Sequence, residues 1–477
     1  MYKSDAENDF LYEKIANNIT ELILEGTYRP GERIPSVRQM SKQQGVSIST
    51  VLQAYLVLEN KGLIEARPQS GYYVRVAVFD QLPEPETSSP SLDPTLVSLQ
   101  ELMMMVLKDT LNPDLIQLGA ALPNLDLLPI SRLNRIISRL ARQSSGEAHQ
   151  YEMPPGVEEL RVQIAKRAVR HGCQFSPQEI VITSGAIEAI DLCLRAVCKP
   201  GDIVAIESPM YYGSLQTLEA NNLRALEMPT HQREGINIEA LKFAIEQNPV
   251  RAVLLVTNFN NPLSSCIPDD KKKELVALLT TYEIPLIEND VLGEIYFGSK
   301  RPLTAKSFDK KGFVMLCSSF SKDISPSLRV GWVAPGRFKA DVEWLKFAKN
   351  AATGTLSQMA VAEFLISGGY DHHLRQMRRE YARNVSLLAQ AVTNYFPQET
   401  RVTRPAGGFV LWVQLPKKID SLELYKLALQ NNITISPGYL FSPSDQFSNF
   451  IRLNAAIWSF PIERAVERLG EIVGSML

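Results

Sequence analysis

The stretch Ser318-Ser319-Phe320-Ser321-Lys322, with Arg329-Val330-Gly331-Trp332 a few residues later, places one lysine beside hydroxyl groups and close to an arginine. The apolar run Phe313–Cys317 comes directly before it, which predicts a buried strand ending in a loop that carries Lys322. A buried lysine amine is a good nucleophile for aldehydes, and a hydroxyl with an arginine suits a phosphate dianion. The stretch predicts a site for a phosphorylated aldehyde, although taken alone it would favour a solvated loop lysine.

The composition indicates a globular chain with several domains. Its 477 residues, 45% of them hydrophobic, can bury a large core and divide into about three domains. No run approaches the roughly 18 apolar residues of a membrane span and the N-terminus is polar, so we expect no signal peptide, no membrane partner and a cytoplasmic location. Five scattered cysteines without Cys-x-x-Cys spacing predict free thiols and no metal site.

The N-terminal region has a local excess of positive charge and a helical pattern. Between residues 28 and 75 seven basic side chains face three acidic ones, whereas the whole chain has a net charge of −2. Apolar spacing predicts a helix from Phe10 to Ile23. Ser36 and Ser47 are placed to cap two further short helices with Gly45 between them. In the third helix we expect an inward stripe and an outward polar face, the stripe formed by Ile48, Val51, Tyr55 and Leu58 and the polar face by Ser49, Thr50 and Gln53.

The runs at residues 63–67 and 72–74, joined by Pro68-Gln69-Ser70-Gly71, predict a β-hairpin after these helices. The segments Gly26 to Arg38, Ser47 to Val51 and Gly71 to Val74 then resemble the GntR family of bacterial regulators. The resemblance implies a winged helix-turn-helix that binds a DNA operator. It implies that the DNA contacts are made by Arg38, by Ser47, Ser49 and Thr50 at the start of the third helix, and by Arg67 of the wing.

A proline-rich segment follows this domain. Pro83, Pro85, Pro90 and Pro94 stand among acidic and hydroxyl residues without apolar periodicity, which predicts an extended and mobile linker. We therefore expect a DNA-binding domain at residues 1–76, a linker at 77–113 and a large domain at 114–477.

Helical patterns alternate with short apolar runs from Gln150 onward. Such alternation predicts an α/β fold with a mostly parallel sheet, helices on both faces, and ligands at the carboxyl ends of the strands. Polar candidates follow those runs: Ser184-Gly185-Ala186 opens a helix that can cradle a phosphate, Tyr211 offers an aromatic face, and Asn261 offers an amide.

These positions, with Lys322 and Arg329, resemble the fold type I aminotransferases, which bind pyridoxal 5′-phosphate. Such a domain behind a GntR-type winged helix resembles the MocR subfamily. The resemblance implies a small α+β domain beside the parallel sheet, and a head-to-tail homodimer. It implies that Lys322 binds the cofactor covalently, that Ser184, Gly185, Ala186, Ser319 and Arg329 hold its phosphate, that Tyr211 stacks on its ring, and that Asn261 binds its phenolic oxygen. It also implies that Tyr151 reaches the phosphate of the partner subunit and that Arg452 binds the carboxylate of a ligand.

One segment departs from the family pattern. The family has Glu-Asp-Asp-x-Tyr where this chain has Glu288-Asn289-Asp290-Val291-Leu292. The first aspartate normally pairs with the protonated pyridine nitrogen, and Asn289 cannot stabilise that cation as a carboxylate does. Asp290 could take its place only if the loop shifted by one residue, which would normally turn the side chain away. We therefore expect little or no turnover.

The sequence thus predicts a transcriptional regulator that binds DNA and pyridoxal 5′-phosphate and senses an amine, amino acid or vitamer. One alternative is a working aminotransferase with an accessory DNA-binding domain. Another is a fold that has lost the cofactor and serves only for dimerisation.

Overall fold

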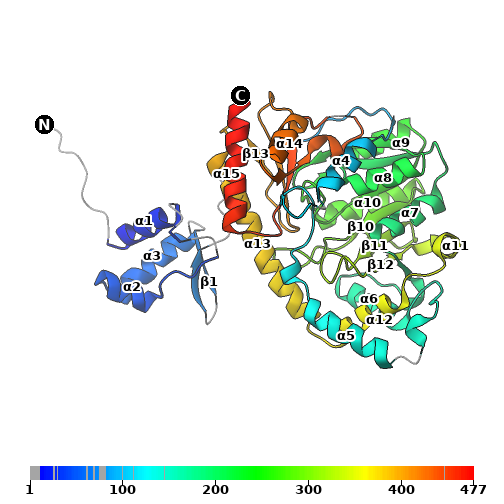
Figure 1. Ribbon diagram of the computed structural model, residues 1–477, viewed down its shortest axis with the longest axis horizontal. Helices are drawn as coiled ribbons and strands as arrows, with labels where there is room; N and C mark the ends of the chain where they lie inside the picture. The colour runs from blue at the N-terminus through cyan, green and yellow to red at the C-terminus, as the bar shows by residue number, and fades with distance from the viewer. Residues whose placement is uncertain are drawn as a thin grey trace.

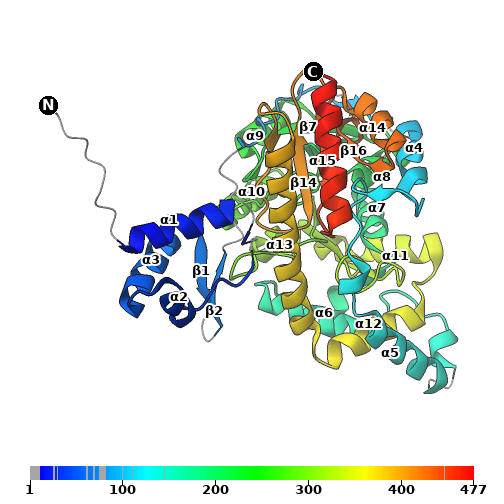
Figure 2. The same ribbon diagram turned by 60° about the vertical axis from the view of Figure 1, so that its left-hand side comes forward.

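The computed structural model describes residues 11–24, 27–28, 31–60, 63–67, 70–74, 82–98, 100–110, 112–143, 146–444 and 446–477. A small N-terminal domain lies beside a larger body, on the side where the long helix α13 (Tyr370–Tyr395) runs (Figures 1 and 2). Within the described residues, no helix is long and apolar enough to cross a membrane.

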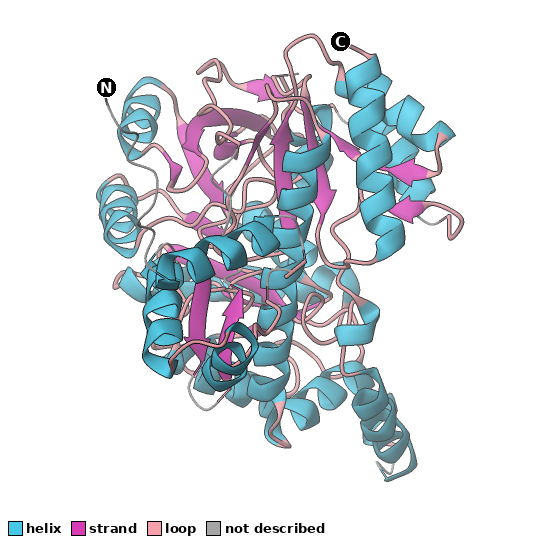
Figure 3. Cartoon of the chain, turned by 90° about the vertical axis from the view of Figure 1, so that its left-hand side faces the viewer, coloured by secondary structure: helices cyan, strands magenta, loops and turns pink. Residues whose placement is uncertain are grey.

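The small domain faces the viewer in Figure 3. Its described residues form three helices and a hairpin. The helices are α1 (Leu11–Leu24), α2 (Val37–Gln44) and α3 (Ile48–Asn60), and the antiparallel strands are β1 (Ile64–Arg67) and β2 (Gly71–Val74). Ser36 caps α2 through the N–H of Gln39, and Ser47 caps α3 through the N–H of Thr50 at 3.1 Å. The core includes Ile15, Ile19, Val51, Tyr55, Leu58 and Val74.

Two expectations for this domain need comment. Ile48 was expected in the inward stripe but is 49% exposed, because it lies on the side of α3 that also exposes Leu52 and Leu56. The predicted helix start at Phe10 and the turn residues Pro68 and Gln69 lie outside the described residues.

The proline-rich segment is extended, but from Leu82 onward it is bound to the body rather than mobile. Glu84 forms an ion pair with Arg233 at 2.5 Å, and the Ser88 hydroxyl donates to the Ser208 carbonyl at 2.6 Å. Strand β3 (Thr95–Leu96) then pairs with the edge of the main sheet. These contacts use hydroxyls, charges and main-chain groups, which apolar periodicity does not reveal. The domain boundaries at residues 76 and 113 stay predictions.

In the described part of the chain, the body is built on a nine-stranded sheet in the order β3-β7-β6-β9-β10-β11-β12-β5, with β8 paired to β7. Strands β7, β6, β9, β10 and β11 run parallel, whereas β12 is antiparallel to both of its neighbours. The strands are β5 Val181–Thr183, β6 Ile203–Ser208, β7 Arg224–His231, β8 Gly235–Ile236, β9 Val250–Leu255, β10 Leu286–Asn289, β11 Val314–Ser319 and β12 Gly331–Ala334.

Helices cover both faces of this sheet because its strands are apolar almost throughout and so present apolar side chains to both faces. One set, including Val204 and Met315, packs against α7 (Ala186–Val197), and the other, including Val253, packs against α9 and α10. The remaining bounds are α5 Ile130–Gln143, α6 Glu158–Arg170, α8 Tyr212–Ala220, α9 Ile238–Gln247, α10 Asp269–Thr281, α11 Lys339–Asn350 and α12 Thr355–Ile366. Because β7, β6, β9, β10 and β11 run parallel, their carboxyl ends meet at one edge of the sheet.

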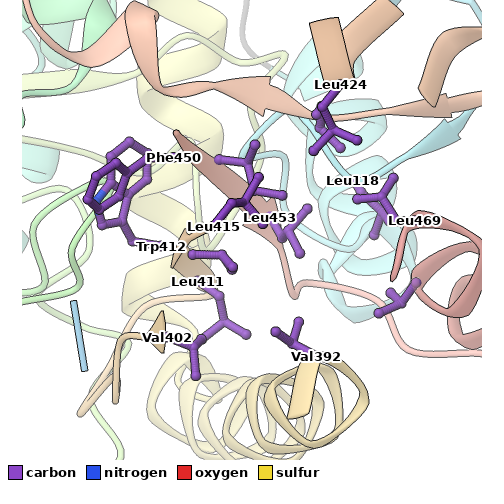
Figure 4. Close-up of a cluster of buried hydrophobic side chains, with 14 of the residues drawn as sticks. Leu118, Val392, Val402, Leu411, Trp412, Leu415, Leu424, Phe450, Leu453 and Leu469 are labelled. Atoms are coloured by element: carbon purple, nitrogen blue, oxygen red, sulfur yellow. The ribbon is translucent and has the colours of Figure 1, made fainter. Parts of the chain in front are cut away.

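The C-terminal part forms a smaller α+β unit. Its antiparallel sheet has the order β13 (Arg401–Val402), β14 (Val410–Gln414), β17 (Phe450–Asn454) and β16 (Ser436–Pro437). Figure 4 shows Leu411 and Leu453 from this sheet packed towards Val392 of α13. The unit also holds α14 (Ser421–Gln430), α15 (Phe460–Ser475), α4 (Gln100–Thr110) and the pair β4 (Ile116–Gln117) and β15 (Ile433–Thr434). This sheet carries Arg452 to the edge where the large sheet ends.

Candidate functional site

Lys322 lies in the turn that follows β11, where the sequence places it. The turn is held by the N–H of Ser321, which donates to Ser319 Oγ at 3.0 Å. The Lys322 ammonium donates to the carbonyl oxygen of Ala121 at 2.8 Å. Burial, with Arg452 and Arg329 nearby, lowers the pKa of Lys322 to about 8. A fraction of the amine is therefore neutral near pH 7, and the neutral form is the one that attacks aldehydes.

The turn between β5 and α7 forms a cradle for an anion. Gly185 has φ 86° and ψ 175°, a conformation that only glycine adopts readily. A Cβ on Gly185 would collide with the Arg329 guanidinium, and one on Gly331 would lie 2.5 Å from the Gly185 backbone. The first N–H groups of α7, from Ala186 on, have no carbonyl partner within the helix. N–H groups, the helix dipole and an arginine thus converge as a phosphate requires.

Hydroxyl groups connect this cradle to the lysine turn. Arg329 donates to Ser321 Oγ and to the Ser184 carbonyl, each at 3.2 Å, and Ser319 Oγ donates to Ser321 Oγ at 2.8 Å. The structure therefore brings Ser184, Ser319 and Arg329 together. Ser321 joins them; sequence reasoning gave it no role, although it belongs to the Ser-x-Ser-Lys motif.

Arg452 lies on β17 and is fully buried. Its guanidinium donates to Asn261 Oδ1 at 3.1 Å, to Ser436 Oγ at 3.0 Å and to the Gly119 carbonyl. Nε of Arg452 has no hydrogen-bond partner among the described residues. This hydrogen bond places Asn261, which was predicted to belong to the site, beside Arg452.

Two tyrosines, Tyr211 and Tyr212, form an aromatic pair beside Arg452. Tyr211 follows β6, and its ring lies 4.6 Å from the ring of Tyr212 between centroids. Burial and Tyr212 raise the pKa of Tyr211, whereas Arg452 and Arg329 act in the opposite direction. The Arg452 guanidinium stands 5.5 Å from the centre of the Tyr212 ring. Tyr212 was missed by the sequence reasoning; the Tyr-Tyr pair at the start of α8 was the available signal.

Asn289 ends β10 with a polar side chain that is only 7% exposed. Its Oδ1 has no hydrogen-bond partner within the described residues, which is unusual for a buried amide oxygen. Strand β10 pairs in parallel with β11, with Asn289 opposite Cys317, so the lysine turn begins a few residues beyond this position. Asn289 thus offers an unused amide at the edge where the other site residues meet.

Asp290 is engaged elsewhere. Its carboxylate pairs with Arg301 and accepts a hydrogen bond from Asn258 Nδ2 at 3.0 Å. It lines a pocket of about 50 Å³ together with Asp323 and Tyr370. Leu292, where the family has tyrosine, is buried in an apolar cluster. These contacts leave Asn289, rather than Asp290, with a side chain that is free to contact a ligand.

Asp323, next to Lys322, is a buried acid that sequence reasoning did not single out. Its Oδ2 accepts a hydrogen bond from the Tyr370 hydroxyl at 2.6 Å, whereas its Oδ1 has no partner among the described residues. Burial raises the pKa of Asp323 to about 7. An acid beside a lysine often belongs to a surface ion pair, so the sequence gave no reason to expect its burial.

Tyr151 stands apart from this cluster and is 78% exposed. It follows the short 3-10 helix Glu147–His149, and Met153, two residues further along the chain, is also exposed. The structure therefore does not bring Tyr151 to the lysine of its own chain. Its predicted reach to a partner subunit stays a prediction.

The residues predicted to contact DNA lie on the surface of the small domain. Arg38 is exposed on α2, and the hydroxyls of Ser47, Ser49 and Thr50 form a cluster at the start of α3, at 2.7 and 2.8 Å from Ser47. Arg67 lies at the end of β1, where it pairs with Glu65 at 2.7 Å and stacks 4.2 Å above the Tyr73 ring. These residues are available on one small domain, as a DNA-contacting surface requires.

Two family matches cover this chain. Residues 113–469 match the aminotransferase class I and II family, and residues 11–74 match the gntR family of bacterial regulatory proteins. The chain belongs to the aminotransferase class I and II family and carries a gntR-type domain before it. The α/β fold and the MocR-type architecture predicted from the sequence are confirmed.

Individual proteins resemble the chain over nearly its whole length. It is 38% identical to the uncharacterized HTH-type transcriptional regulator YdcR of Escherichia coli K12, covering 98% of this chain and 99% of YdcR. It is 39% identical to YjiR of the same organism, described in the same words, covering 97% and 98%. Among solved structures, it resembles the α-aminoadipate aminotransferase LysN of Thermus thermophilus, complexed with N-(5′-phosphopyridoxyl)-L-leucine, with a TM-score of 0.72, 27% identity and coverage of 80% and 99%.

Proposed function

We propose that this protein is a DNA-binding transcriptional regulator whose large domain binds pyridoxal 5′-phosphate and senses an amine, an amino acid or a vitamer. The names of its E. coli relatives, HTH-type transcriptional regulators, support the regulatory role. A regulator of this kind works on chromosomal DNA in the cytoplasm, as a homodimer that presents two winged helices to its operator.

The residues at the sheet edge fit the cofactor. The Lys322 amine has its pKa lowered to about 8, and Gly185 leaves open a cradle that any larger residue would fill. Arg329 supplies a positive charge beside that cradle, and Asn289 offers an amide oxygen that no described residue uses. When bound, the cofactor supplies an aldehyde that captures amines and a ring that withdraws electrons. LysN, crystallised with a phosphopyridoxyl-leucine conjugate, supports a ligand of this chemical class.

The observation that favours a sensor over an enzyme is Asn289. Capture of an amine needs the Lys322 turn, the phosphate cradle and Arg452, all of which this chain has. Removal of an α-proton needs in addition a carboxylate that keeps the ring nitrogen protonated. Asn289 carries no charge, and the Asp290 carboxylate is paired with Arg301. We therefore expect the site to bind an amine without converting it to a product.

The second candidate is a working aminotransferase with an accessory DNA-binding domain. The buried Arg452, with Nε lacking a described partner, favours it because such an arginine could hold an α-carboxylate in a substrate as well as in an effector. Product formation from amino acids, measured with the purified protein and a keto acid, separates the two: steady turnover establishes the enzyme.

Borohydride reduction tests the cofactor assignment. Reduction of the purified protein incubated with pyridoxal 5′-phosphate should fix one cofactor per chain on Lys322, since its amine lies beside the phosphate cradle. Peptide mass spectrometry identifies the modified residue. Lys322→Ala should lose both the adduct and the visible absorbance, whereas Lys311→Ala, which changes an exposed lysine, should keep them. An adduct on another lysine would contradict the assignment.

Salt-dependent DNA binding tests the other domain. Arg38→Ala should weaken binding to every duplex about ten-fold and lower the slope of log affinity against log salt by about one, because one phosphate contact is lost. Fluorescence anisotropy with a labelled promoter fragment measures both. Arg142→Ala, at an exposed arginine of α5 in the body, is the control and should change neither. Equal affinity of the Arg38 variant and the wild type would remove Arg38 from the interface.

A further inference from the structure

Helix α3 exposes a stripe of large apolar side chains. Ile48, Leu52 and Leu56 are 49%, 45% and 51% exposed, although Val51, Tyr55 and Leu58 of the same helix are buried in the core. Residues four apart lie on one side of a helix, so the three exposed side chains form a continuous strip. A strip of this kind on a small domain requires an occupant.

The charge around the strip identifies the kind of occupant. Arg38 and Lys42 of α2 are exposed on the same small domain, and Arg67 lies on its wing. The strip begins beside the Ser47, Ser49 and Thr50 hydroxyls, at the end of α3 that enters the major groove in a helix-turn-helix. An apolar strip on a domain that also exposes cations fits DNA, which is anionic at its backbone and carries methyl groups in its major groove.

The residue types of α3 restrict what it can read there. The helix contains no lysine and no arginine, the side chains that most often read guanine. Its one acid, Glu59, accepts a hydrogen bond from the Ala66 N–H at 3.2 Å and so holds the wing. The hydroxyls at its start are bonded to one another. The groups of α3 that remain free to contact bases are its exposed apolar side chains, which suit thymine methyl groups, and the exposed Gln53 amide, which suits adenine.

We propose that Ile48 and Leu52 read thymine 5-methyl groups in the major groove, so that each half-site of the operator carries A·T pairs opposite the first two turns of α3. The inference rests on the proposed DNA-binding function and specifies its sequence preference. Leu56 stands roughly 12 Å along the helix axis from Ile48, so it lies beyond the bases and takes no part.

Replacement of thymine by deoxyuridine tests the methyl contact, because the two bases differ only by that group. Duplexes are first selected from a random pool with the full-length protein. The best duplex is then resynthesised with dU for dT at each A·T pair of the half-sites, and affinities are measured by anisotropy. We expect about a four-fold loss at each thymine that is read, the effect of removing one buried methyl group.

Three variants assign that loss to residues. Ile48→Ala and Leu52→Ala should each bind more weakly and lose discrimination between dT and dU at one position, whereas Leu56→Ala, the matched control on the same strip, should keep it. All three side chains are half exposed, so melting temperatures should stay within a few degrees of wild type.

Each result has a distinct meaning. Equal binding of dT and dU duplexes, or a selected half-site rich in G·C pairs, overturns the inference and leaves DNA binding intact. A change of oligomeric state in the leucine variants without any dT preference assigns the strip to a protein contact and also overturns it. Failure to enrich any duplex overturns the proposed DNA-binding function itself, and this inference with it.

Discussion

We infer that Asn289 limits the chemistry that the site can perform. Its amide ends β10 with Oδ1 lacking a described partner, at the position where the family places the acid under the ring nitrogen. With Asn289→Asp, we expect deuterium exchange at the α-carbon of a bound amino acid to rise at least about ten-fold. A carboxylate at this position can keep the ring nitrogen protonated, and the protonated ring stabilises the negative charge left when the α-proton is removed. The measurement compares wild type and variant by NMR, with cofactor content checked by absorbance. Leu292 in place of tyrosine will limit the gain.

Asp290→Asn is the matched control beside it. Loss of the carboxylate that pairs with Arg301 should lower the free energy of unfolding by about 3 kcal/mol, since it leaves the buried guanidinium with only the more distant Glu294 carboxylate, at 3.6 Å, to balance its charge. It should not change α-deuterium exchange in protein that retains the cofactor. If instead Asp290→Asn alters exchange and Asn289→Asp does not, Asp290 is the residue at the ring nitrogen.

Single residues also mark where sequence reasoning stops. Lys322, Arg329 and Gly185 were predictable because each stands at a fixed place beside a strand or helix start. Asp323 gave no such signal, since its importance comes from burial and from a partner distant in sequence, Tyr370. Ser321 stands in the Ser-x-Ser-Lys motif, but its bond to Arg329 becomes visible only in the fold. The exposure of Ile48 could not be predicted either, because α3 carries apolar side chains on more than one side, and periodicity alone does not show which of them face the core.

At the scale of elements, the turn between β5 and α7 depends on Gly185. Gly185→Ala should abolish cofactor binding and lower the free energy of unfolding by about 1–3 kcal/mol. The backbone at this position would be strained for alanine, and the alanine Cβ would collide with Arg329. Gly201, with φ 91° and nothing within 4 Å of a built Cβ, is the control: Gly201→Ala should show similar backbone strain and keep the cofactor. Absorbance titration and thermal unfolding measure the two effects. Equal cofactor loss in both variants would show that strain alone, and not the cradle, is responsible.

The alternation of strands and helices was predictable because it is written in apolar periodicity. The segment from Leu82 to Leu96 was not: its attachment depends on an ion pair, on the Ser88 hydroxyl and on two residues of strand pairing. Prolines prevent regular structure but do not prevent binding to an existing surface. A proline-rich pattern therefore predicts extended chain and is silent on whether the chain is free.

At the scale of the whole molecule, we infer that the proposed cofactor site is completed by a second copy of the chain. Tyr151 is 78% exposed and does not join the cluster around Lys322 of its own chain. Leu122, Leu125, Ile130 and Met153 expose apolar surface in the same part of the sequence, which suits a subunit contact. In a symmetric dimer each chain can then supply Tyr151 to the phosphate held by the other.

Co-expression of two variants tests that exchange. Tyr151→Phe alone should bind cofactor about ten-fold more weakly, because a hydrogen bond to a charged phosphate is lost, and Lys322→Ala alone should form no adduct. In a dimer isolated through two different tags, one site combines Lys322 of the Tyr151→Phe chain with Tyr151 of the Lys322→Ala chain. That site is complete, so the mixed dimer should regain wild-type affinity at half the sites. Weak binding in the mixed dimer, equal to that of the Tyr151→Phe homodimer, would mean that Tyr151 acts within its own chain or not at all. Sedimentation at the same concentrations confirms that each sample is a dimer and that lost affinity does not reflect dissociation.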